Sequence, residues 1–272
     1  MKTSNHLRFS LLGLLSGSIA LHLSLVAHSE NSDLLGSSVL FWLAIVALLW
    51  KKRFHFDFSS DVFSSSLGAF LVALVLIKST FLVGNDIFLR VFPFLCILGI
   101  GLIASGVNKI DQYWRELGLL AFFIVPSGLV SIFVDISIWT AKFAALVLWC
   151  LGFEVSRQAL LIHLPKGSIE VYAGCSGMAM ILQLLGLALI YLCLCQTKPH
   201  QKLLLPAIAI GIAFVMNGVR VALMAVLVAL SNQSAFEYWH VGNGSLIFST
   251  IAVVCFGMLC NFLIPQPDKL HG

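Results

Sequence analysis

The sequence places a reactive side chain in a flexible turn before a long apolar segment. Cys175 stands between Gly174 and the pair Ser176–Gly177, and residues 178–195 are almost wholly apolar. A thiol at a helix N-terminus meets free backbone N–H groups and the positive end of the helix dipole, which favour the thiolate. The glycines allow a tight turn and close approach of another backbone. The turn fits a nucleophilic cysteine, and it equally fits a buried cysteine at the start of a membrane helix.

Three further polar side chains lie close to apolar segments. Asn217 and Arg220 are three residues apart inside the apolar run 203–230, so they share one face of a helix. An arginine there costs a few kcal/mol and usually faces a partner or a water-filled cavity, although it can also reach the headgroups. His240 follows Tyr238 and Trp239, where an interfacial aromatic belt with a solvated histidine is the alternative interpretation.

A thiol, a permanent cation and an imidazole are the groups that acyl transfer requires. Histidine takes the thiol proton and later gives it to the leaving amine. Arginine can stabilise the thiolate or the oxyanion, together with backbone N–H groups that follow the cysteine. We expect the catalytic residues to be Cys175, Arg220 and His240, with support from Ser176, Gly177 and Asn217.

Composition identifies the class of protein that carries these residues. Of 272 residues, 60% are hydrophobic and 10% are charged, and the mean hydropathy is +1.01. This predicts an all-α polytopic integral membrane protein, with residues 1–272 as a single membrane domain. The net charge of +4 is small, so nucleic-acid binding is not expected. Seven cysteines without metal-finger spacing predict no disulfide framework, no metal and no other cofactor.

Apolar runs predict about eight transmembrane helices. Segment 137–152 is shorter, covering about 24 Å against a hydrocarbon core of about 30 Å, so we expect an outer-interface or re-entrant helix there. The predicted spans are 9–27, 34–50, 62–83, 87–107, 117–134, 177–195, 203–230 and 245–264.

Loop charges predict the orientation of these spans. The N-terminus and the loops at 51–53 and 196–202 carry basic residues, which places all three in the cytoplasm. Eight crossings satisfy all of them, put both termini inside and leave 135–175 outside. If 137–152 also crossed, the 196–202 loop would lie outside against this rule. With eight crossings, the three expected catalytic residues share the outer side.

Three short motifs together resemble the exosortase/archaeosortase family of membrane cysteine transpeptidases. They are Val-Tyr-Ala-Gly-Cys-Ser-Gly-Met at 171–178, Asn-Gly-Val-Arg at 217–220 and Trp-His-Val-Gly at 239–242, each placed relative to apolar segments as in that family. The resemblance covers about 85–264, the expected catalytic core, and leaves 1–84 as N-terminal helices without a motif. It is greatest to the cyanobacterial type, the cyanoexosortases.

The resemblance implies a protein-sorting enzyme of the bacterial inner (plasma) membrane. Its partners would be exported proteins whose C-terminal tail has a Pro-Glu-Pro-like signal, one transmembrane helix in the lipid bilayer and a basic end. Cys175 would form an acyl-enzyme near the signal, and an acceptor nucleophile at the surface would then release the product. The sequence does not identify that acceptor.

Other classes of membrane protein remain open at this stage. A transporter or channel would have Arg220, Asn217 and His240 along its path, but that class usually distributes polar groups over several spans and contains repeats, which this sequence lacks. A structural or assembly protein would tolerate loss of Cys175. An intramembrane hydrolase would use the same residues and release its product to water.

Overall fold

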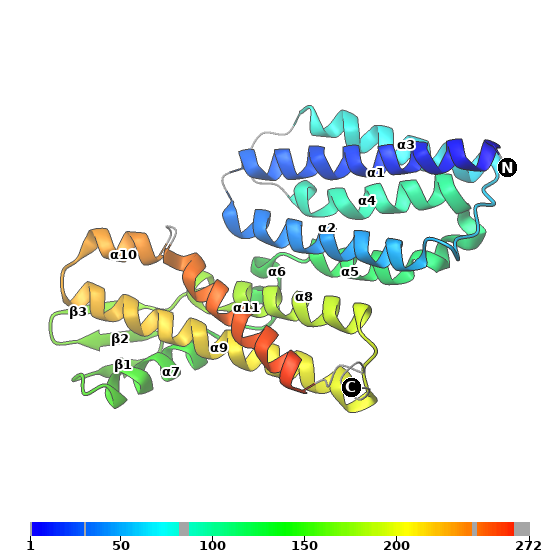
Figure 1. Ribbon diagram of the computed structural model, residues 1–272. Helices are drawn as coiled ribbons and strands as arrows, with labels where there is room; N and C mark the ends of the chain where they lie inside the picture. The colour runs from blue at the N-terminus through cyan, green and yellow to red at the C-terminus, as the bar shows by residue number, and fades with distance from the viewer. Residues whose placement is uncertain (1, 30, 82–86, 241–243, 264–272) are drawn as a thin grey trace. The chain divides into compact units, whose positions relative to one another are not determined.

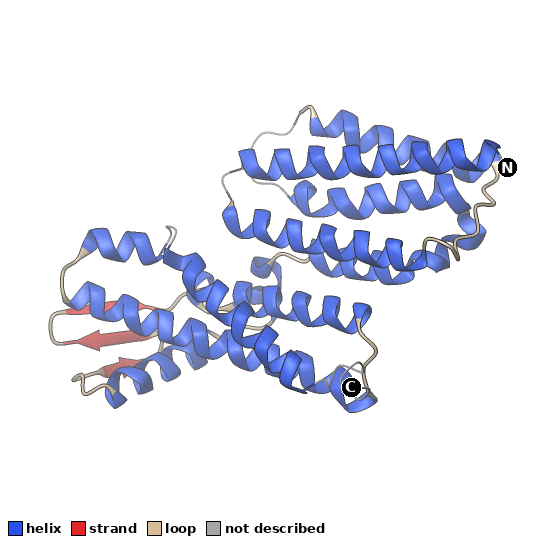
Figure 2. Ribbon diagram, viewed as in Figure 1, coloured by secondary structure: helices blue, strands red, loops and turns tan. Residues whose placement is uncertain are grey.

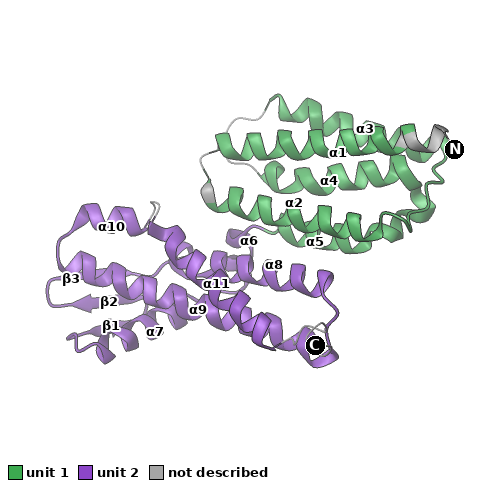
Figure 3. Ribbon diagram, viewed as in Figure 1, with its two compact units in different colours: residues 1–125 green, residues 126–272 purple. Residues whose placement is uncertain are grey.

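The computed structural model describes residues 2–29, 31–81, 87–240 and 244–263, which are predominantly helical (Figure 1). They form two compact units, Met1–Val125 and Pro126–Gly272, which are considered separately (Figure 3). Seven helices in the described chain are long and apolar enough to cross a membrane, or eight if one broken pair counts as a span. The prediction of an all-α polytopic membrane protein is therefore confirmed.

The first unit contains four of the candidate spans. Asn31 and Asp61 cap the second and third helices, each accepting a hydrogen bond from a backbone N–H of the first turn. The third and fourth helices approach closely through glycines, because a Cβ on Gly68 would lie 2.5 Å from the carbonyl oxygen of Gly99. The helices are α1 (Lys2–His28), α2 (Ser32–Lys52), α3 (Val62–Ser79) and α4 (Ile87–Ser105), followed by the 3-10 helix η1 (Val107–Tyr113) and α5 (Trp114–Ile124).

Two buried polar groups join helices within this unit. The His22 imidazole accepts a hydrogen bond from Trp42 Nε1 at 3.0 Å, and its Nε2 lies 2.7 Å from the Leu89 carbonyl oxygen. These bonds connect α1, α2 and α4. Lys52 forms an ion pair with the fully buried Glu116 at 3.0 Å. The composition of the chain predicts the spans, but it does not single out these contacts.

The expected span 117–134 consists of two helices. Helix α5 ends at Ile124, and α6 (Ser127–Phe133) begins after Pro126. Val125 and Pro126 have extended backbone, with ψ angles of 111° and 143°. Proline disfavours helical backbone in the residue before it and has no N–H of its own, so the chain breaks here.

The second unit combines helices with a small antiparallel sheet (Figure 2). Helices α8, α9 and α11 share a hydrophobic core that includes Leu184, Ala209 and Phe256. The elements are α7 (Ser137–Cys150), β1 (Ser156–Gln158), β2 (Leu161–Leu164), β3 (Gly167–Glu170), the 3-10 helix η2 (Ala173–Cys175), α8 (Met178–Leu194), α9 (Pro199–Ala229), α10 (Gln233–His240) and α11 (Gly244–Leu263).

The sheet packs one face against α7 and α9. Its strand order is β1-β2-β3, and Ile162 of β2 is fully buried in a cluster with Ala144 of α7 and Ala225 of α9. This sheet adds a feature that the sequence analysis did not anticipate between the short helix and the cysteine turn. Helix α7 has the short length expected for 137–152, while its depth in the membrane stays a prediction.

Helix α9 is longer than the span expected at 203–230. Its 31 residues, beginning at Pro199, extend about 46 Å, against a hydrocarbon core of about 30 Å. Arg220 lies about 32 Å from the start of the helix. If the N-terminus of α9 is cytoplasmic, as the basic loop before it predicts, then Arg220 lies at the outer boundary of the hydrocarbon core. The rest of α9 then extends beyond that boundary.

Candidate active site

The cysteine turn is held by its own backbone. Cys175 ends η2, and its N–H donates to the Tyr172 carbonyl at 2.9 Å, while the Ser176 N–H donates to the Ala173 carbonyl at 3.3 Å. Gly177 then adopts a left-handed conformation with φ 97°, and α8 begins at the next residue. Since the amides of Cys175 and Ser176 are already engaged, the expectation that backbone N–H groups after the cysteine receive an oxyanion does not hold for Ser176.

Two buried side chains fix the same turn from neighbouring helices. Asn217 of α9 donates from Nδ2 to the Cys175 carbonyl at 3.0 Å, and Thr140 of α7 donates from Oγ1 to the Ser176 carbonyl at 2.6 Å. A Cβ on Gly177 would lie 2.7 Å from Asn217 Nδ2. Asn217 and Gly177 therefore position the nucleophile and do not touch the reacting atoms. Thr140 was not among the expected site residues, because its position in an apolar helix belongs to no motif.

Substitution of Gly177 by alanine is expected to lower turnover by about 10²-fold, because a small displacement of a reacting group has an effect of that order. The left-handed backbone and the short distance to Asn217 both oppose a Cβ at this position. Gly211→Ala on α9 is the matched control, since a Cβ there meets nothing within 4 Å. Cleavage rates of the two variants at equal membrane abundance make the comparison. Wild-type turnover by Gly177→Ala would contradict this role.

His240 lies beside the cysteine. It is the last residue of α10, and its Nε2 is 3.3 Å from Cys175 Sγ. Phe236, one turn earlier, stacks on the imidazole with ring centroids 5.0 Å apart, and Trp239 packs edge-on against a phenylalanine of α11. The connection between the predicted spans 203–230 and 245–264 thus contains a helix, which orients the histidine. The last two positions of this motif, 241 and 242, lie outside the described residues.

Arg220 holds the end of α10. Its Nη2 donates to the His240 carbonyl at 2.6 Å, and its Nε lies 3.4 Å from the Trp239 carbonyl. The last carbonyls of a helix have no partner within the helix, and a cation stabilises that end of its dipole. Within the described residues Arg220 has no carboxylate partner. It therefore fixes the backbone that carries the imidazole.

A cavity of about 250 Å³ joins these groups. Cys175, Arg220 and His240 all line it, so the structure brings together the three residues expected to be catalytic. The walls come from β3, the segment that follows β3, α9 and α10. Its other lining residues are Ser168, Ile169, Glu170, Val171, Tyr172, Val221, Met224, Val228 and Phe236.

The protonation states of two cavity residues fit acyl transfer. Burial and the nearby Arg220 charge lower the pKa of His240 below its ordinary value, so the imidazole is neutral and can accept a proton at neutral pH. A side-chain hydrogen bond with Cys175 and the charge of a thiolate there raise the pKa of Tyr172. Its phenol therefore stays a donor. Tyr172 was not among the expected site residues, although it stands within the cysteine motif.

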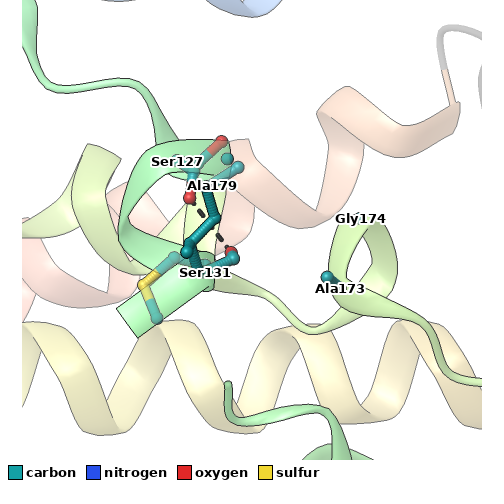
Figure 4. Close-up of a pocket in the computed structure, with 8 residues that line it drawn as sticks. Ser127, Ser131, Ala173, Gly174 and Ala179 are labelled. Carbon is teal, nitrogen blue, oxygen red and sulfur yellow. Dashed lines mark hydrogen bonds between the residues drawn. The ribbon is translucent and has the colours of Figure 1, made fainter. Parts of the chain in front are cut away.

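A second cavity, of about 190 Å³, borders the cysteine turn without including Cys175 (Figure 4). Small residues dominate its lining, among them Ser127 and Ser131 of α6. The Ser131 hydroxyl donates a hydrogen bond to the Ser127 carbonyl at 3.0 Å. Gly174 also lines it, and a Cβ on Gly174 would lie 2.6 Å from the Tyr172 ring. The glycine before the nucleophile thus leaves room for the tyrosine.

Comparison with known proteins places the chain in a family. The family described as Transmembrane exosortase (Exosortase_EpsH) matches residues 29–257. This match begins well before residue 85, where the region of the motif resemblance begins. A probable archaeosortase E of Methanocaldococcus jannaschii is 26% identical over 156 residues, covering 56% of this chain and 82% of that protein. No solved structure matches the chain. The family match spans most of the chain and contains all the residues of the cysteine cavity, and the chain therefore belongs to the exosortase family of membrane proteins, which process sorting signals.

Proposed function

We propose that this chain is a membrane cysteine transpeptidase that cuts the C-terminal sorting tail from exported proteins at the outer face of the bacterial inner membrane. The observation that carries the proposal is the 3.3 Å approach of His240 Nε2 to Cys175 Sγ, in a cavity that Arg220 also lines. The family supplies the class of substrate, an exported protein with a signal, a transmembrane helix and a basic end. The site supplies the chemistry.

The first half-reaction forms a thioester. His240 Nε2 takes the thiol proton while Cys175 Sγ attacks the carbonyl carbon of the scissile peptide bond. As the tetrahedral intermediate collapses, the C–N bond breaks and His240 gives its proton to the leaving amine, which departs with the transmembrane tail. In the second half-reaction an acceptor loses a proton to His240 and attacks the thioester. The C–S bond breaks as the acyl group passes to the acceptor, and the proton on His240 returns to the released sulfur.

Side chains are the donors that face the oxyanion in this proposal. The amides of Cys175 and Ser176 are occupied by turn hydrogen bonds. Tyr172 offers a phenolic O–H in the cavity, and Arg220 keeps N–H groups beyond the two that hold α10. A donor aimed at the developing charge stabilises the transition state more than the ground state.

Tyr172→Phe is expected to lower kcat by about 10²-fold with little change in KM, because one oxyanion donor contributes about that much. The ring is retained, so its packing over Gly174 is unchanged. Tyr238→Phe serves as the control, since this exposed tyrosine of α10 lies outside the cavity lining. Steady-state cleavage of a tailed peptide gives both parameters. A Tyr172→Phe enzyme with wild-type kcat would remove the tyrosine from the mechanism.

The membrane setting explains why the nucleophile stands where it does. With the basic N-terminal end of α9 in the cytoplasm, as this proposal has it, the length of α9 supports a position of Arg220 at the outer boundary of the bilayer. A substrate anchored by its own helix presents its signal at that depth. Tethering makes the encounter effectively intramolecular, so binding of the signal itself can be weak.

Co-expression with a tailed reporter tests the function. The reporter is expected to lose its tail with the wild-type chain and to keep it with Cys175→Ala at equal membrane abundance. The mass of the new C-terminus then separates transfer from hydrolysis, because an acceptor adds mass and water leaves a free carboxylate. Reconstituted flux that survives Cys175→Ala would instead favour a transporter.

A further inference from the structure

Strand β3 is an edge of its sheet, and one side of it is unpaired. The Val171 N–H donates to the Leu160 carbonyl at 3.0 Å, just beyond the β2–β3 ladder. Antiparallel ladders alternate, so Ile169 is the next residue whose backbone groups face β2. The N–H and C=O of Ser168 and Glu170 therefore face the open edge. Within the described chain, no backbone partner satisfies them.

This open edge borders the cavity of the nucleophile. Ser168 and Glu170 line the cavity together with Cys175. Helix α9 contributes Met224 to the same cavity, and α10 contributes His240. Open strand edges are templates for a further strand, and proteins usually cover them. Here the edge leads along the chain to the reactive thiol.

We propose that β3 binds the substrate segment on the N-terminal side of the scissile bond, as an added fourth strand. The proposal rests on the proposed function, since it concerns the peptide that Cys175 would cleave. Backbone hydrogen bonds to Ser168 and Glu170 would carry this binding. They would hold an extended peptide of varied sequence and lead its scissile carbonyl toward the cavity.

The packing of β3 on α9 gives the direction of the added strand. A Cβ on Gly167 would lie 3.0 Å from Val228, near the outer end of α9, whereas Cys175 is bonded to Asn217. Val228 comes eleven positions after Asn217 in the helix, which is about 16 Å along the axis. An exported chain that passes Gly167, reaches Cys175 and then enters the membrane runs parallel to β3.

Parallel pairing sets the register of one substrate residue. In a parallel ladder, a residue donates its N–H to the carbonyl of one residue of the neighbouring strand. Its own carbonyl accepts from the N–H of the residue two positions further along that same neighbouring strand. The Ser168 carbonyl and the Glu170 N–H are such a pair. They would bracket a single substrate residue opposite Ile169.

A signal of the Pro-Glu-Pro type suits this one-sided edge. Successive residues of a strand face alternate edges, and proline has no N–H to donate. If prolines stand on both sides of the bracketed residue, their backbone nitrogens lie on the edge of the substrate strand that faces away from β3. The absence of an N–H on these prolines therefore costs no hydrogen bond to β3. The middle residue keeps its N–H and C=O for Ser168 and Glu170. Proline at the middle position would remove that bond.

Backbone-methylated peptides test the proposal on the substrate. A tailed peptide is bound to the full-length Cys175→Ala protein in lipid nanodiscs, with affinity measured by fluorescence anisotropy. N-methylation of the residue between the prolines is expected to raise Kd about tenfold, the effect of one lost hydrogen bond. N-methylation three residues earlier, where the N–H faces away from β3, is the control. Equal affinity of the two methylated peptides would overturn the proposal.

Proline substitution tests it on the enzyme. Glu170→Pro removes the donor at the open edge of β3, and Arg157→Pro makes the same change at the outward-facing backbone of β1, on the opposite edge. A Kd raised about tenfold for Glu170→Pro alone is expected. If Glu170→Pro does not fold, the peptide comparison still decides.

Cleavage by the wild-type chain, measured separately, distinguishes the two proposals. Methylation-sensitive binding without any cleavage would reject the transpeptidase and keep the β3 site. Cleavage that depends on Cys175 but ignores methylation would reject the β3 site and keep the transpeptidase.

Discussion

Replacing Cys175 by alanine is expected to lower tail cleavage by at least about 10⁴-fold, because removal of a nucleophile eliminates the covalent route. The structure gives no reason for misfolding. The turn is held by backbone hydrogen bonds and by contacts of Asn217 and Thr140 with its carbonyls, all of which alanine retains. Cleavage of a tailed reporter, normalised to the membrane abundance of each variant, measures the effect.

Cys150→Ala is the matched control for this experiment. Cys150 is an exposed free cysteine in the same unit and does not line the cavity. Cys175→Ser is also expected to be inactive, since a hydroxyl is a far weaker nucleophile than a thiol beside a neutral imidazole. Processing by Cys175→Ala at more than a few per cent of the wild-type rate would show that another group attacks the substrate.

His240→Ala is expected to lower kcat/KM by about 10²- to 10⁴-fold, the range for loss of a general base. His163→Ala is the control, because this histidine belongs to β2 of the same unit and lies outside the cavity lining. In the wild-type enzyme the base works when deprotonated, so activity falls as the pH drops through its pKa. The midpoint of this fall, which is the acid limb of the pH–activity profile, should lie below the ordinary histidine pKa of 6.5, because burial and the charge of Arg220 lower the pKa of His240.

Arg220 variants separate charge from positioning. Arg220→Gln removes the charge and should move the acid limb upward toward the ordinary histidine pKa, with a lower rate. Arg220→Lys keeps the charge but cannot hold two carbonyls of α10 with a planar fork. Its acid limb should stay near that of the wild type while kcat falls. An acid limb that both variants leave unchanged would contradict the electrostatic effect of Arg220 on His240.

Apolar run length was sufficient to predict most of the helices. Helices such as α8 and α11 each consist of a single apolar run. Such a run in lipid has no water to bind its backbone N–H and C=O groups, so it forms a helix, which pairs them within the segment. The short helix α7 was also visible as a short apolar run, whereas the segment predicted as one span at 117–134 is broken at Pro126. The sheet was missed because β2 has only four residues, too few for alternation to be distinguished from a loop.

The approach of the site residues was predictable only in outline. Loop charges predicted that Cys175 and His240 share one side of the membrane, but no spacing gives the distance between their side chains. The hydrogen bonds of Arg220 depend on α10, a helix of eight residues that lies between two of the predicted spans and was not itself predicted. Tyr172 and Thr140 act through contacts that only the fold creates.

The most direct test of the account is the mass of the covalent intermediate. The wild-type chain is mixed with a tailed reporter, quenched in acid within seconds and digested for mass spectrometry. The proposed mechanism predicts that the peptide containing Cys175 carries the N-terminal part of the reporter as a thioester, that hydroxylamine removes this adduct, and that Cys175→Ala forms no adduct. An adduct on a different residue, or reporter cleavage that persists in Cys175→Ala, would contradict the account.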